Sequence, residues 1–147
     1  MAYILIFPRN LLYLSISSEH VREVKISDGG WITALNGDNA TFGGNAKVSL
    51  SGAVSGQQEY QDHGPVQPIT VNPIDVTAVV CSSDRAQTML FGHAAVNGSG
   101  SYEYRIDLTD NGEPGANDMY GILLPGWLPL PYASGTQKLG GGNIQIR

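Results

Sequence analysis

The stretch SYEYRIDLTDNGEPGAND, residues 101–118, decides the fold class, because it joins a clear strand pattern to a loop rich in turn formers. Its first half alternates apolar with polar side chains: Tyr102, Tyr104, Ile106 and Leu108 against Ser101, Glu103, Arg105 and Asp107. This period of two predicts a β-strand with one buried face. In the second half, Gly112, Pro114 and Gly115 favour a loop.

The loop is also acidic, with four carboxylates and no Lys or Arg in residues 107–118. Calcium binds about six to eight oxygen atoms from carboxylates, amides and backbone carbonyls. The sequence therefore predicts a Ca²⁺ site formed by Asp107, Asp110, Asn111, Glu113, Asn117 and Asp118. Their spacing is not that of an EF-hand. In the alternative interpretation, the same side chains accept hydrogen bonds from local backbone N–H groups of a solvated loop.

The composition is that of one all-β domain. The chain has 147 residues, of which 41% are apolar, only 14% are charged and 19 are Gly. This length can bury a core, and low charge combined with frequent Gly, Ser, Thr and Val is typical of strands and tight turns. We expect a single domain over residues 1–147.

Charge and hydropathy argue against two classes of partner. The net charge is −5 and the eight basic residues are scattered, whereas nucleic-acid binding needs clustered Lys and Arg. No segment approaches the roughly 20 apolar residues of a membrane span. The apolar N-terminus has no basic start and no small-residue cleavage site, so we expect no signal peptide in this chain. Residues 140–142 lack the helix and Lys of a phosphate loop, so no nucleotide or organic cofactor is expected.

Turn formers divide the rest of the chain into short segments with strand patterns. We expect strands at residues 3–7, 11–16, 21–26, 31–35, 40–50, 54–60, 69–71, 74–80, 88–96, 119–124 and 143–147. Asp28, Gly29 and Gly30 are expected to form a turn, and Asn72 and Pro73 to interrupt a strand. About nine to eleven short antiparallel strands must close to bury an apolar face, so the predicted fold is an antiparallel β-sandwich or flattened barrel.

Four segments follow the order of a known family: ATFGGNAKVS at 40–49, GQQEYQDH at 56–63, YRIDLTDNGEPGANDMYGI at 104–122 and GGGNIQIR at 140–147. Through them the chain resembles the post-choice-of-anchor P (post-COAP) type of bacterial β domain over about residues 28–147. Residues 1–27 lie outside the match. Such domains are small all-β modules near the C-termini of predicted exported or surface proteins. The resemblance therefore implies an extracellular or cell-surface location in a bacterium, and it carries over no activity.

The histidines indicate an enzymatic alternative. Asp62, His63 and His93 can in principle hold Zn²⁺ and activate a water molecule. The chain would then be a small metal-dependent hydrolase that acts on an ester or a lactone. No HxH or HExxH spacing supports such a site, so zinc is favoured less than calcium. In the alternative interpretation, His63 is a surface residue and His93 is packed in a strand.

Aromatic residues indicate a third class, a carbohydrate-binding module. Trp31, Trp127 and Tyr132 lie in or near predicted loops, where an exposed ring can stack on a sugar. Alternatively, Trp127 and its neighbouring prolines cover one end of the sandwich. The leading interpretation is a non-catalytic extracellular accessory module, structural or ligand-binding, and calcium-stabilised if the acidic loop binds the ion. Its ligand would be a small molecule or a glycan, and exposed edge strands would allow a homodimer.

Overall fold

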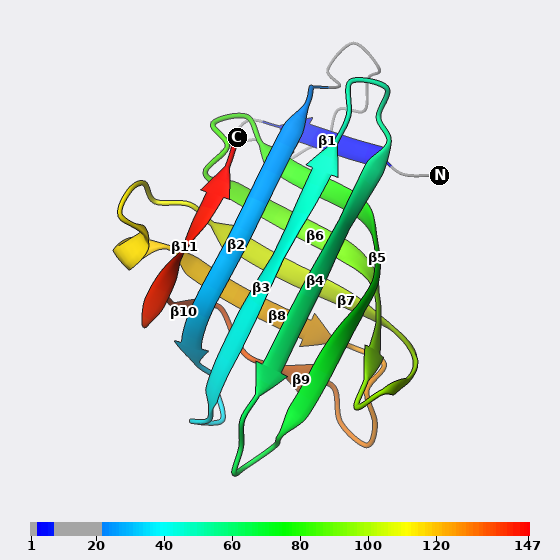
Figure 1. Ribbon diagram of the computed structural model, residues 1–147, viewed down its shortest axis with the longest axis vertical. Coiled ribbons are helices and arrows are strands. Elements are labelled where there is room, and N and C mark those ends of the chain that lie inside the picture. Colours follow the sequence, from blue (N-terminus) through cyan, green and yellow to red (C-terminus); the bar gives the residue numbers. More distant parts are fainter. Residues whose placement is uncertain (1–2, 8–21) are drawn as a thin grey trace.

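Figure 1 shows the computed structural model of the chain, which describes residues 3–7 and 22–147. The described residues form eleven strands in one curled sheet. Their bounds are β1 Tyr3–Phe7, β2 Val24–Thr33, β3 Asn39–Val48, β4 Val54–Asp62, β5 Ile69–Ser82, β6 Gln87–Val96, β7 Ser99–Thr109, β8 Met119–Leu124, β9 Tyr132–Ala133, β10 Gln137–Lys138 and β11 Gly141–Ile146. One 3-10 turn, η2 (Gly115–Asn117), precedes β8. Among the described residues, no helix is long and apolar enough to cross a membrane.

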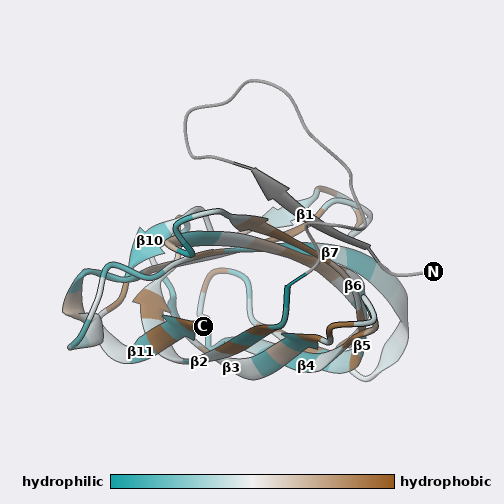
Figure 2. Cartoon of the chain, turned by 90° about the horizontal axis from the view of Figure 1, so that it is seen from above, coloured by the Kyte–Doolittle hydropathy of each residue, from teal (hydrophilic) through white to brown (hydrophobic). Residues whose placement is uncertain are grey.

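The strands follow the order β10-β8-β7-β6-β5-β4-β3-β2-β11, with β1 beside β5 and β9 beside β8. Each of these pairs is antiparallel except β1 with β5, which is parallel. The sheet curls over itself, so that β11, β2, β3 and β4 form one layer and β5 to β8 form the layer behind it (Figures 1 and 2). The predicted all-β fold, a flattened barrel of antiparallel strands, is confirmed.

The two layers enclose one apolar core. On β7, Tyr104, Ile106 and Leu108 are buried, which confirms the alternation predicted for this strand. Phe42 of β3 stacks on Tyr120 of β8, with ring centroids 3.9 Å apart. Because β3 and β8 belong to different layers, this contact joins the two halves of the barrel.

β5 carries the chain from one layer to the other. Its start pairs with β4, and its end pairs with β1. Register shifts against β6 lie between Pro73 and Asp75 and between Val76 and Ala78, and such bulges bend a strand. The predicted interruption at Asn72 and Pro73 is therefore wrong, because both residues lie within a strand that bends without ending.

Asp28, Gly29 and Gly30 lie within β2, so the turn predicted there is also wrong. Gly30 is opposite Gly142 of β11. A Cβ atom at Gly30 would overlap the Gly141 carbonyl oxygen. The glycines therefore let two strands approach closely and do not reverse the chain.

The strands predicted in the first 50 residues agree with the structure in part. The strand expected at residues 3–7 is confirmed as β1. The strand expected at 11–16, and the start of the one expected at 21–26, lie outside the described residues. The alternation expected to continue through Leu50 ends with β3 at Val48, because Leu50 lies in the β3–β4 turn with 73% of its surface exposed.

Candidate functional site

The acidic loop between β7 and β8 closes the seam of the barrel. Among the described strands, β11 pairs with β2 alone. On its other side, the Ile144 N–H donates to Asp118 Oδ2 at 2.8 Å and the Ile146 N–H donates to Asp110 Oδ2 at 3.0 Å. Two carboxylates thus accept the hydrogen bonds that a neighbouring strand would otherwise accept. We call Asp110 and Asp118 the carboxylate latch.

The latch residues also hold their own loop. Asp118 Oδ1 accepts the Asn111 N–H at 2.8 Å, and Asp110 Oδ1 accepts the Gly112 N–H at 3.0 Å. Asp118 has an exposed fraction of 0%, so its N–H partners replace the water that an exposed carboxylate would bind. These local bonds are of the kind that the alternative interpretation of the loop predicted.

Glu113 extends the contact between this loop and β11. Its carboxylate accepts hydrogen bonds from Gln145 Nε2 at 2.8 Å and from Asn143 Nδ2 at 2.9 Å. The bonds from Gln145 and Asn143 hold the pKa of Glu113 below its ordinary value. Asp107 makes no such contact and pairs with Arg105 of its own strand, with the Arg105 Nε 3.0 Å from Asp107 Oδ1.

The predicted calcium ligands are therefore engaged in separate contacts. The side chain of Asn111 donates to the Asn117 carbonyl oxygen at 2.7 Å. Within the described part of the chain, no three His, Cys, Asp or Glu side chains gather into a group that could hold a metal ion. The calcium site stays a prediction, while the hydrogen bonds show how these carboxylates are satisfied by the chain itself.

Asp62, His63 and His93, the residues of the predicted zinc site, have separate partners. His63 Nε2 lies 2.9 Å from Thr41 Oγ1 on the exposed surface. His93 Nδ1 lies 2.9 Å from Asp75 Oδ1, while Asp62 is buried against two tyrosines. The hydrolase site stays a prediction without support from these contacts.

A buried network that sequence reasoning missed fixes the loops at one end of the barrel. Tyr132 OH donates to Asp62 Oδ2 at 2.7 Å and lies 2.6 Å from Tyr60 OH. Asp62 also accepts N–H groups of Asn36 and Gly64. Burial raises the pKa of Tyr60 and of Tyr132, so both remain neutral donors near pH 7. Tyr132 is 1% exposed, so no face of its ring is open to the sugar that the sequence assigned to it.

Asp38 fastens two of these loops to each other. Its carboxylate is 2% exposed and accepts the Val66 N–H at 3.0 Å and the Gln67 N–H at 2.8 Å. Burial raises the pKa of Asp38, but the hydrogen bonds from the Gln67 and Val66 N–H groups lower it further, so the pKa lies below its ordinary value. The β2–β3 and β4–β5 loops are thus joined through an ionised carboxylate. Asn36, Gly37 and Asp38 have the composition of a turn, and such a local pattern does not reveal the partner loop.

A second buried polar pair lies in the core. Asp28 is 8% exposed, and its Oδ2 accepts a hydrogen bond from Gln58 Nε2 at 3.0 Å. Burial raises the pKa of Asp28 to about 6, although the bond from Gln58 lowers it. Asp28 Oδ1, Gln58 Oε1 and the Tyr120 hydroxyl have no hydrogen-bond partner among the described residues. Such groups are costly in an apolar core.

The outer surface of the front layer is rich in amides and hydroxyls. Register aligns its outward residues across β11, β2, β3 and β4 in three rows: Gly141, Trp31, Thr41 and Gln61; Asn143, Gly29, Gly43 and Glu59; Gln145, Ser27, Asn45 and Gln57. Of these residues, only Glu59 carries a charge. We call this surface the amide face.

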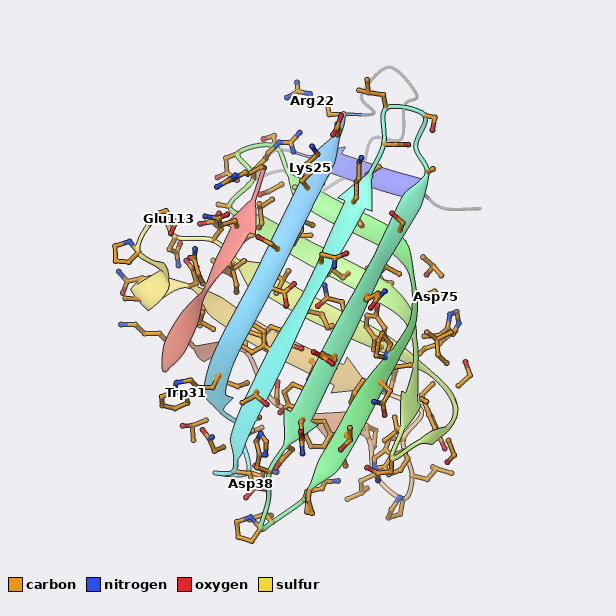
Figure 3. The ribbon with its side chains drawn as sticks, viewed as in Figure 1. Arg22, Lys25, Trp31, Asp38, Asp75 and Glu113 are labelled. Carbon is orange, nitrogen blue, oxygen red and sulfur yellow. The ribbon has the colours of Figure 1, made fainter. Side chains whose placement is uncertain are left out.

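Trp31 is the only aromatic residue of the amide face, and Figure 3 shows it where β2 ends. Its indole occupies the space that Cβ atoms at Gly140 and Gly141 would need, with Nε1 only 2.7 Å from the Cβ position at Gly141. The side chain is nevertheless 41% exposed. The indole therefore rests on two glycines on one side and meets solvent on the other.

A shallow polar groove of about 250 Å³ continues the amide face toward β5. Thr41, Glu59 and Gln61 line it from the amide face, and Thr70 and Asn72 line it from β5. Hydroxyl, amide and carboxylate groups from three neighbouring strands therefore line one groove, and Thr41 and Gln61 belong to the row that begins with the exposed indole.

Comparison with protein-family models, with curated proteins and with solved structures found no match to this chain. The fold and the amide face define the class of protein as an all-β module with a polar, nearly uncharged outer surface. The resemblance to post-COAP domains stays a prediction from the sequence.

Proposed function

We propose that this chain is a non-catalytic ligand-binding β module whose ligand is a neutral carbohydrate. The observation that carries the proposal is the amide face, where Trp31 is exposed on a glycine support beside a groove of hydroxyl and amide groups. An exposed indole among amide and hydroxyl groups matches the two kinds of surface that a sugar ring presents.

A sugar ring presents C–H groups on its faces and hydroxyl groups around its rim. An indole buries the C–H face, and amide and hydroxyl side chains both donate to and accept from the rim hydroxyls. Thr41, Gln61 and Thr70 continue the row of Trp31 across three strands. Strands lie about 4.8 Å apart, so this row spans roughly 14 Å, which is enough for more than one sugar ring.

Two glycines leave room for a ligand beside the indole. Gly29 and Gly43 face each other across β2 and β3 in the middle of the amide face. A Cβ atom at either position would have no heavy atom nearer than 3.9 Å. The surface above them therefore has room for a ligand stacked on Trp31, and the Glu59 carboxylate borders this space, with Oε1 3.9 Å from the Cβ position at Gly43.

The charge of the amide face favours a neutral ligand. It contains neither Lys nor Arg, the residues that bind phosphate, sulfate or carboxylate groups. Lys25 and Lys47 pair with each other across β2 and β3, two residues beyond Ser27 and Asn45. They therefore flank the face at one end, and Glu59 is the one charged side chain within it.

The wider role is supported by the sequence resemblance. A post-COAP type domain would sit on an exported or surface protein of a bacterium, where this module would hold its host near a glycan. The hydrolase alternative has no comparable support, because Asp62, His63 and His93 have separate partners. Calcium would enter this proposal only as a structural ion at the acidic loop.

Binding to soluble and insoluble polysaccharides tests the proposal. We expect Trp31→Ala to weaken binding at least about tenfold, because it removes the aromatic surface, and Trp31→Tyr to retain part of the affinity. A second variant, Gly140→Ala, keeps the indole but displaces it from its support, so it should also weaken binding.

Trp127→Phe is the matched control. Trp127 packs edge-on against Tyr102, with ring centroids 5.3 Å apart, and lies outside the amide face. This variant should bind polysaccharide like the native chain. Affinity that survives Trp31→Ala unchanged, or the lack of binding to any polysaccharide, would contradict the proposal.

A further inference from the structure

Three loops project from the same end of the barrel. Figure 1 shows the β2–β3 loop (residues 34–38), the β4–β5 loop (63–68) and the β8–β9 loop (125–131) at its lower end. Hydrogen bonds between the loops agree with this arrangement. The Leu35 N–H donates to the Ser134 carbonyl oxygen just after β9, and Asp38 accepts the Val66 N–H. We call these three loops the loop end.

Large apolar side chains are exposed at the loop end. Leu35 is 72% exposed and Val66 is 66% exposed. In the β8–β9 loop, Leu128 is 77% and Leu130 is 72% exposed. Single exposed apolar residues are common on monomeric proteins. Four such side chains on three neighbouring loops form an apolar patch exposed to water, which is typical of an interaction site.

The loop end has no exposed charge. Its three loops contain no Lys, Arg or Glu. Asp38 is buried and accepts backbone N–H groups, and the ring of His63 contacts the Thr41 hydroxyl. The exposed charged side chains of the described residues therefore lie elsewhere on the molecule.

The β8–β9 loop also exposes few backbone donors. Pro125, Pro129 and Pro131 have no N–H group, and an unpaired N–H is what makes irregular backbone costly in an apolar medium. Buried Leu124 and Tyr132 anchor the two ends of the loop in the core. The exposed leucines therefore lie between two fixed positions of the chain.

We propose that the loop end inserts into the interface of an uncharged lipid bilayer through Leu35, Val66, Leu128 and Leu130. The four exposed side chains lie on three loops, and a fluid bilayer can surround them without offering a complementary groove. Half-buried Trp127 lies at the base of the longest loop, the level at which tryptophan is favoured at a membrane surface. This association is peripheral and independent of the proposed carbohydrate binding.

Flotation of the full chain with phosphatidylcholine vesicles tests the proposal. We expect the native chain to float with the vesicles and Leu128→Asp/Leu130→Asp to lower the bound fraction roughly tenfold or more, because both side chains would carry charge into the bilayer. Leu50→Asp is the matched control: Leu50 is 73% exposed in the β3–β4 turn, at the opposite end of the barrel (Figure 1). This variant should float like the native chain.

Salt and lipid charge separate insertion from electrostatic adsorption. Because the loop end is uncharged, raising the salt concentration should leave flotation unchanged, and adding phosphatidylserine should not increase it. Trp31→Ala should float normally, which keeps this result distinct from carbohydrate binding. Unchanged melting midpoints would show that the aspartate variants are folded.

Three results would overturn the proposal. The native chain would fail to float, or Leu50→Asp would lose flotation as fully as the loop variant does. Alternatively, the native chain would self-associate in light scattering, Leu128→Asp/Leu130→Asp would abolish this association, and neither would bind vesicles. In that last case the loop end would be a protein-binding surface.

Discussion

Asp28 places a carboxyl group between the two layers of the sheet, where its charged form is poorly solvated. Burial raises its pKa from 3.8 to about 6, against the lowering effect of the Gln58 bond. The folded chain therefore binds this proton more tightly than the unfolded chain does. It follows that the contribution of Asp28 to the free energy of unfolding falls as pH rises from about 3.8 to about 6. Above pH 6, the full cost of burying the ionised carboxylate lowers the stability of the folded chain.

Asp28→Asn should stabilise the protein at pH 8. The substitution removes the charge and keeps a side-chain oxygen that can accept the Gln58 hydrogen bond. We expect the free energy of unfolding to rise by up to about 3 kcal/mol at pH 8. The gain should shrink toward zero near pH 4, where the native carboxyl is protonated in the folded chain. Denaturant unfolding at the two pH values measures the difference.

Asp28→Ala provides the control for this prediction. It removes the charge but also the acceptor of the Gln58 amide, so it should be less stable than Asp28→Asn at both pH values. If Asp28→Asn were less stable than the native chain at pH 8, the buried carboxylate would be satisfied by groups that the geometry does not reveal.

At the scale of elements, the carboxylate latch provides hydrogen-bond acceptors for the edge of β11 that no strand covers. An open strand edge presents unpaired N–H groups that other chains can pair with. Asp110 and Asp118 take the N–H groups of Ile146 and Ile144, so side chains of one loop replace a strand. Asp110, Glu113 and Asp118 accordingly lie in a short loop that contacts β11.

Asp118→Asn should destabilise the protein by about 2–3 kcal/mol. Both carboxylate oxygens of Asp118 accept N–H groups in a fully buried site. An amide offers one oxygen and turns its own NH₂ toward the second donor, which leaves a buried N–H without an acceptor. The matched control is Asp107→Asn, which removes a partly exposed pair with Arg105 and should cost less than about 1 kcal/mol.

Hydrogen exchange and EDTA distinguish the latch from a calcium site. In Asp118→Asn, the amides of Ile144 and Asn111 should exchange faster, while those of the β2–β3 pair keep their protection. EDTA should leave the melting midpoint of the native chain unchanged, because N–H donors from the chain satisfy the latch carboxylates. A midpoint that falls with EDTA would favour the calcium prediction and count against this account of the loop.

What the sequence predicted well depends on neighbours along the chain. The alternation in β7 is local, so its buried face followed from the period of two. The hydrogen bond from the Gly112 N–H to Asp110 could be predicted for the same reason, since the two residues are neighbours in the chain. The donors Ile144 and Ile146 could not be predicted, because they contact the loop only when the sheet curls.

The sequence predictions that were wrong concern residues whose role depends on segments far away in the chain. Gly29 and Gly30 have the composition of a turn, but their role is set by Gly141 and Gly142, more than 100 residues away. Trp31 was a candidate for sugar binding from its type and its position near a predicted loop, whereas its glycine support comes from Gly140 and Gly141. The buried contacts of Tyr132 with Asp62 and Tyr60 likewise join segments that no local pattern connects.

At the scale of the whole molecule, β1 completes the back layer where β4 stops. β4 pairs with β5 only at residues 69–71, and β1 takes the edge of β5 at residues 78–82. Among the described strands, β1 is the one that pairs in parallel, and it comes from the N-terminal part of the chain. Without it, a run of β5 would present an unpaired edge to solvent.

A chain that begins at residue 22 should therefore self-associate more strongly than the full chain, with a mass in light scattering that rises with concentration. Val80 lies in this edge and is paired with Leu5, so Val80→Lys in the shortened chain should restore the lower mass, because a charged edge opposes pairing. The homodimer predicted from open edges would then arise at β5 when β1 is absent. Equal masses for the full and shortened chains at every concentration would mean that this edge is no template, and that a homodimer of the full chain would have to form through another surface.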